Sequence, residues 1–124
     1  MNIDKVEKAV DYKHNGCNCC QAVLMAFEDE LELSAEQLKT LGSGFGAGMG
    51  CMEATCGALI GANMILGMKN NTGTPTGPKS RQLLNDFKAA CGATICKDLK
   101  GLGTGKVLCE CDDCVRNAVR ALLD

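Results

Sequence analysis

Ten cysteines stand among the 124 residues of the chain, and they fall into four groups. The groups are Cys17, Cys19 and Cys20; Cys51 and Cys56; Cys91 and Cys96; and Cys109, Cys111 and Cys114. A thiolate is both the nucleophile of thiol-disulfide exchange and a ligand for iron or zinc, so this density indicates redox or metal chemistry. Cysteine is also a common small core residue, so we expect about three or four of the ten to be buried only for packing.

The last group has a spacing that favours chelation. In Cys109-x-Cys111-x-x-Cys114, one loop cysteine and two at a helix start can turn their sulfurs toward one metal or cluster. Structural zinc sites often add histidines to their cysteines, whereas this chain has only His14, which we expect at the surface. The pattern therefore disfavours structural zinc and leaves an iron-sulfur cluster and thiol-disulfide exchange open.

Several of these cysteines fall at predicted helix starts, namely Cys19, Cys56, Cys111 and Cys114. Unpaired backbone N–H groups and the helix dipole favour a thiolate there. Cys56 follows Thr55, the expected cap, and precedes Gly57 and Gly61, which remove side chains from the helix surface beside it. A cluster or a partner disulfide can then meet backbone, so we expect Cys56 at the centre of the site, with both glycines beside the bound group.

The elements that position these thiols are predicted to be helices, because apolar residues recur with the helical period and no segment alternates as a strand does. We expect one all-α domain over residues 1–124, with about five or six helices and a glycine-rich loop. The expected helices cover residues 4–13, 18–33, 34–41, 56–68, 80–99 and 112–123, and a linker covers 70–78.

Two cysteines lie on apolar stripes and are expected in the core. Cys20 shares a helix face with Leu24, Phe27 and Leu31, in a helix that Asn18 can cap. Cys91 shares another stripe with Leu84, Phe87 and Ile95. Cys19 lies about 100 degrees round its helix from Cys20, so its thiol is free to face a site.

Glycine occupies every second position from Gly42 to Gly50. The G-x-G-x-x-G spacing of dinucleotide sites fails in every register, so we expect unusual backbone conformations or close approach to a buried group. Residues 100–106 likewise fail the phosphate-loop pattern, because Val107 stands where a Ser or Thr is needed. The small face formed by Gly57, Ala58, Gly61 and Ala62 suits internal packing better than a homodimer interface, which remains the alternative.

Composition and charge exclude other classes. A net charge of −2 with no Trp, one Tyr and three Phe disfavours a nucleic-acid partner. The longest weakly charged stretch, residues 47–68, contains Glu53 and five glycines, so no membrane span is expected. The first residues are acidic where a signal peptide is basic, so we expect a cytoplasmic protein.

The chain resembles the C-GCAxxG-C-C family, whose members are described as redox-active. The resemblance rests on residues 18–24, NCCQAVL, on the glycine run followed by CGALIG at 56–61, and on later cysteines in the expected order. It implies a small helical redox protein distantly similar to the iron-sulfur part of split-Soret cytochromes, with the four family cysteines at Cys19, Cys56, Cys96 and Cys114. The chain departs from the pattern in having six further cysteines, namely Cys17, Cys20, Cys51, Cys91, Cys109 and Cys111.

The leading prediction is an electron-transfer or redox-sensing protein that binds an iron-sulfur cluster and works with a redox partner protein. The expected ligands are Cys19, Cys56, Cys96 and Cys114, with Cys109 and Cys111 as alternatives. The second possibility is a metal-free thiol-disulfide oxidoreductase in which Cys56 or Cys19 is the catalytic nucleophile. The third is a protein that sequesters or carries metal without redox turnover.

Overall fold

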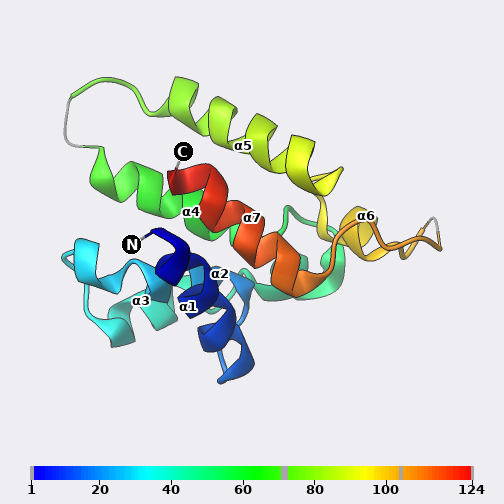
Figure 1. The fold of residues 1–124 in the computed structure, drawn as a ribbon, viewed down its shortest axis with the longest axis horizontal. Coiled ribbons are helices and arrows are strands. Elements are labelled where there is room, and N and C mark those ends of the chain that lie inside the picture. The colour runs from blue at the N-terminus through cyan, green and yellow to red at the C-terminus, as the bar shows by residue number, and fades with distance from the viewer. Residues whose placement is uncertain (1, 71–72, 104, 124) are drawn as a thin grey trace.

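The computed structural model describes all residues except 1, 71–72, 104 and 124. Within this part of the chain there are helices and no β-strands, which confirms the all-α prediction (Figure 1). The α-helices are α1 (Asn2–His14), α2 (Cys19–Ala26), α3 (Ala35–Gly42), α4 (Gly57–Lys69), α5 (Gly77–Cys91), α6 (Cys96–Lys100) and α7 (Cys111–Leu123). A 3-10 turn η1 (Glu28–Glu30) and a π-turn η2 (Gly48–Met52) complete them.

The short helix α2 lies at the centre of the packing, against α1, α3, α4 and α7. The last helix, α7, also packs on α1, α4 and α5, so it joins the two halves of the chain (Figure 1). The largest fully buried side chains include Leu24, Phe27, Ile65 and Phe87. Cys20 is fully buried among them, as its place on the apolar stripe predicts.

Asn18 fixes the start of α2 and ties it to the glycine-rich loop. Its Oδ1 accepts a hydrogen bond from the Gln21 N–H at 2.8 Å, and Gln21 Oε1 accepts one from the Asn18 N–H at 2.9 Å. This reciprocal capping box satisfies donors that a helix start leaves unpaired. The Asn18 amide also donates to the Gly42 carbonyl at 3.1 Å, so the same side chain holds the end of α3 beside the start of α2.

Two glycines let α4 cross α2 at close range. A Cβ added at Gly61 would lie 2.9 Å from the Cys20 carbonyl oxygen, and one at Gly57 would lie 2.6 Å from the Phe45 carbonyl oxygen. Ala58 and Ala62 on the same helix are also fully buried. The small face of this helix therefore serves internal packing in the fold, as the sequence favours.

The prediction of one long helix over residues 18–33 is wrong for its second half. The α-helix ends at Ala26, and the acidic run Glu28-Asp29-Glu30 forms a 3-10 turn. Three carboxylates at a helix C-terminus oppose the helix dipole. Two of them are held by cations: Lys5 pairs with Asp29 at 2.8 Å and with Glu30 at 2.9 Å, and Lys69 also pairs with Glu30.

The helix expected over residues 80–99 is two helices. Gly92 has φ +95°, a left-handed conformation that ends α5 at Cys91, and α6 begins separately at Cys96. The register of the predicted stripe also shifts, because Leu83 is buried while Leu84 is 41% exposed. Phe87 and Cys91 keep their predicted buried positions. No helix in the described residues is both long enough and apolar enough to span a bilayer.

Candidate cysteine site

Five thiols line one cavity of about 200 Å³. They belong to Cys17, Cys19, Cys56, Cys96 and Cys111, and the remaining lining residues are Lys13, Asn18, Ala47, Gly48, Met52, Gly57 and Lys100. All five cysteines are free thiols. Cys56 and Cys96 are each 3% exposed, whereas the other three are partly exposed. The cavity is therefore closed on one side by buried sulfur and reached from the other.

Four helix starts converge on this cavity. Cys19, Cys96 and Cys111 are the first residues of α2, α6 and α7, and Cys56 is the N-cap residue of α4. The sequence predicts Thr55 as the cap, and this is wrong, because Thr55 pairs with Ile95 in an isolated bridge.

This bridge joins the segment before α4 to the segment before α6. The Cys56 N–H donates to the Thr94 carbonyl at 2.8 Å, and the Cys96 N–H donates to the Ala54 carbonyl at 3.0 Å. These two backbone hydrogen bonds fix both segments, so Cys56 and Cys96 are held together by the main chain.

The glycine-rich loop closes the cavity in a strained conformation. Ala47, Met49 and Met52 have φ of 51°, 62° and 65°, in the left-handed region that costs residues with a side chain energy. Gly48 also has positive φ, and a Cβ there would lie 2.6 Å from the Cys96 Cβ. The loop thus combines unusual backbone with close approach to a buried group, which are the two features that the glycine pattern predicts.

The thiols of Cys19 and Cys111 are neighbours whose pKa values are shifted in opposite directions. The hydrogen bond from Cys19 and a second one from Lys100 lower the pKa of Cys111 to about 5, against desolvation by burial. The pKa of Cys19 is raised by the same hydrogen bond and by burial. Within this pair the thiolate is favoured on Cys111, because the Lys100 side chain also lowers the pKa of that thiol.

Cys56 is the second thiolate position. A hydrogen bond from the Cys114 thiol is the largest cause that lowers the pKa of Cys56, to about 7. The backbone N–H groups of Ala58 and Leu59 add to this, because they are unpaired donors at the start of α4. Cys114 is not among the residues that line the cavity, and its own pKa is raised well above the ordinary thiol range.

Cys114 belongs to a second sulfur group, the buried triad of Cys91, Cys109 and Cys114. Their sulfurs all lie within 4.8 Å of one another, and all three residues are buried. The Asn117 amide donates to the Cys91 sulfur at 3.4 Å, and the Cys114 thiol donates to the Cys109 carbonyl at 3.7 Å. A group of three buried thiols with this geometry can hold a metal ion.

The structure thus divides the ligands named from the sequence between two places. Cys19, Cys56, Cys96 and Cys111 line the cavity, whereas Cys109 and Cys114 lie in the buried triad. Gly57 lines the cavity, and Gly61 lies at the crossing with α2.

Sequence reasoning assigned no site role to Cys17, which lines the cavity, or to Cys91, which joins the triad. The only sequence signal for Cys91 was its position on an apolar helix stripe, which is equally compatible with a core residue and with a metal ligand. Cys51 is exposed and lies in neither group.

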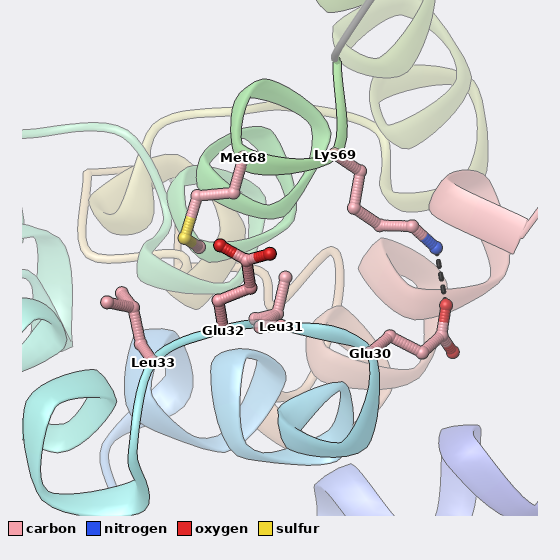
Figure 2. A pocket seen from close by; sticks show the side chains of 6 residues that line it. All are labelled: Glu30, Leu31, Glu32, Leu33, Met68 and Lys69. Carbon is pink, nitrogen blue, oxygen red and sulfur yellow. Dashed lines mark hydrogen bonds and ion pairs between the residues drawn. The ribbon is translucent and has the colours of Figure 1, made fainter.

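Another hollow, of about 450 Å³, lies between the turn after η1 and the end of α4 (Figure 2). Figure 2 shows the side chains of Leu31, Glu32 and Met68 pointing toward one another across it, with the Lys69–Glu30 ion pair at its edge. No cysteine lines it. Its two carboxylates and one ammonium offer no redox chemistry, so the sulfur sites remain the functional candidates.

A family model described as "Putative redox-active protein (C_GCAxxG_C_C)" matches residues 17–124. No curated protein and no solved structure matches the chain.

Proposed function

The chain belongs to the C_GCAxxG_C_C family of redox-active proteins, and we propose that it transfers electrons or senses redox state through an iron-sulfur cluster in the cysteine cavity. The proposed ligands are Cys19, Cys56, Cys96 and Cys111. The observation that carries this proposal is the enclosure of one cavity by thiols from four separate helix starts. The cytoplasm, where thiols stay reduced, is the compartment that this chemistry suits.

The donor set of the cavity fits such a cluster. Iron-sulfur clusters are held by four cysteine thiolates, and the cavity offers four from separate elements, with Cys17 beside them. About 200 Å³ of space separates the sulfurs, so a group larger than a single ion has room. Lys13 and Lys100 line the same cavity and offset the negative charge of the thiolates.

A bound cluster would supply one-electron redox chemistry, and the protein residues determine its access. Cys56 and Cys96 are buried, so water is excluded from that side of the cavity. Cys19 and Cys111 are partly exposed, at the adjoining starts of α2 and α7. Electrons therefore enter or leave past these two residues, and a redox partner protein docks on this side.

The test is anaerobic purification followed by iron and sulfide assays and a visible spectrum. The wild type should be brown and contain iron and acid-labile sulfide in similar amounts. Cys96→Ser should lose both, because the hydroxyl is a poor ligand for a soft metal site. Cys51→Ser is the matched control, since Cys51 is exposed and outside the cavity, and it should keep both. A colourless wild type without iron after reconstitution would refute the proposal.

The same assay identifies the fourth ligand. Cys111 lines the cavity, whereas Cys114 does not and belongs to the buried triad. Cys111→Ser should therefore abolish cluster binding, and Cys114→Ser should leave most of the iron in place. The reverse result would show that the ligand set implied by the family resemblance holds and that the cavity rearranges on binding.

The contact between Cys19 and Cys111 supports a second function, thiol-disulfide exchange without metal. In this reaction the Cys111 thiolate attacks a substrate disulfide, and one substrate thiolate leaves. Cys19 then displaces the second, so that the protein holds a Cys19–Cys111 disulfide and the substrate is reduced to two thiols. This function predicts that iron-free protein reduces small disulfides, and that Cys19→Ser stalls as a mixed disulfide at Cys111.

A further inference from the structure

We propose that the buried triad of Cys91, Cys109 and Cys114 is a second metal site, separate from the cysteine cavity, and that it binds one monovalent copper ion. The three sulfurs lie within 4.8 Å of one another, so one ion can touch all three. Cys91 ends α5, Cys114 lies in the first turn of α7, and Cys109 comes from the segment just before α7. The packing of α5 on α7 therefore builds the site.

The coordination number favours a monovalent soft ion. Thiolates select copper(I), zinc or iron-sulfur clusters, and structural zinc is almost always four-coordinate. In the described part of the chain, no fourth cysteine, histidine or carboxylate joins the triad within the same distance. All three residues are at most 7% exposed, so the triad is largely shielded from bulk water. Three buried thiolates with no open position suit copper(I).

Asn117 supports the triad from one side. Its amide donates to the Cys91 sulfur at 3.4 Å and points toward the Cys109 sulfur at 4.0 Å. Arg120 donates to the Asn117 carbonyl oxygen at 3.4 Å, which turns the amide nitrogen toward the sulfurs. Such outer partners stabilise thiolates and orient them for a metal, as in other metal sites.

A route for the ion leads in through the surface. A hollow of about 350 Å³ is lined by Cys109, Asn117 and Arg120, together with Glu110 and Asp113. Its two carboxylates can draw a cation toward Cys109, which forms its wall. Cys114 of the triad also lowers the pKa of Cys56, which lines the cavity, so the two sulfur groups are neighbours.

The experiment is anaerobic copper(I) titration of the reduced protein against a chromophoric copper(I) chelator. The background is Cys17→Ser/Cys19→Ser/Cys96→Ser/Cys111→Ser, which leaves Cys56 as the one thiol among the described cavity lining and keeps the triad intact. This variant should bind one copper(I) per chain, and addition of Cys91→Ser should abolish that equivalent. Cys20→Ala in the same background is the matched control, because Cys20 is another buried cysteine outside both groups, and it should keep the ion.

A folded variant with the ligands intact gives a second measurement. Asn117→Ala should weaken copper(I) binding about 10–100-fold without removing a sulfur. No copper(I) in the cavity-disabled background would overturn the inference, as would full retention after Cys91→Ser or displacement of the copper by an equal amount of zinc. The copper(I) titration does not depend on the iron assay. If the wild type contains no iron-sulfur cluster, the proposed function fails, but the copper(I) result for the triad still stands.

Discussion

The crossing of α4 over α2 offers a sharp test of how this fold positions its thiols. Gly61 and Gly67 lie in the same helix, six residues apart. A Cβ at Gly61 would stand 2.9 Å from the Cys20 carbonyl oxygen and 3.3 Å from the Val23 Cβ, whereas nothing lies within 4 Å of a Cβ at Gly67. Both substitutions to alanine therefore gain helix propensity, but only Gly61→Ala introduces close contacts.

The magnitudes follow from this difference. Alanine is about 1 kcal/mol more favourable than glycine within a helix, so Gly67→Ala should stabilise the protein by roughly 0.5–1 kcal/mol near the helix end. Overpacking costs about 1–3 kcal/mol, and the obstacle at Gly61 is backbone that cannot swing aside, so the upper part of that range applies. Gly61→Ala should then lower the free energy of unfolding by roughly 2 kcal/mol after the propensity gain is subtracted.

Urea unfolding of the reduced, metal-free protein, followed by circular dichroism at the helix minimum, measures both variants. The expected difference between them is about 2.5–3 kcal/mol, equivalent to a melting-temperature gap of roughly 10 °C for a chain of this size. If Gly61→Ala is as stable as Gly67→Ala, the close crossing is not a tight contact, and the account of how Cys19 and Cys56 are brought together fails.

Four further predictions concern the parts around the site. Cys20→Ala should keep iron content unchanged and cost about 1 kcal/mol in urea unfolding, because Cys20 is core and not ligand. Met49→Gly should stabilise the protein by about 0.5–1 kcal/mol in the same assay, because it relieves a left-handed conformation at an exposed side chain. Asn18→Ala should cost about 1 kcal/mol or more by thermal melting, because both the capping box and the tie to Gly42 are lost. The pKa of Glu30 is lowered by Lys5 and Lys69, so its contribution to stability is present above pH 4.5 and is lost as pH falls through the lower folded value; Glu30→Gln should flatten the acid side of a stability-against-pH curve.

Local patterns in the sequence were enough to predict the helical class and several of its boundaries. The cap at Asn18 is present as expected, because it depends on residues three apart in the chain. The break between α5 and α6 was missed although Gly92 marks it, because Ile95 continues the apolar period past the glycine. The shift from Leu84 to Leu83 reflects the same limit, since two adjacent leucines satisfy one periodic pattern equally well.

The partition of the cysteines into two groups was beyond reach of the sequence. Cys111 and Cys114 are both near the start of α7 and differ by three residues, so spacing alone treats them alike. In the fold they point to different neighbours, Cys111 to Cys19 and Cys114 to Cys91. Which thiol faces which neighbour depends on where α2 and α5 pack, and that is tertiary information.

The cavity thiols come from four separate helices, so the packing of the fold decides whether they are in place before a metal binds. In small zinc domains the metal supplies the folding energy, because the chain has too little core of its own. Here the core contains Phe27, Phe87 and Ile65, all fully buried, and backbone hydrogen bonds fix Cys56 and Cys96 without any sulfur bridge. The thiols are therefore in place without a metal, so the metal-free protein should keep its helical circular dichroism. The same preorganisation gives Lys100 a role, because it lowers the pKa of Cys111 whether or not a cluster is bound.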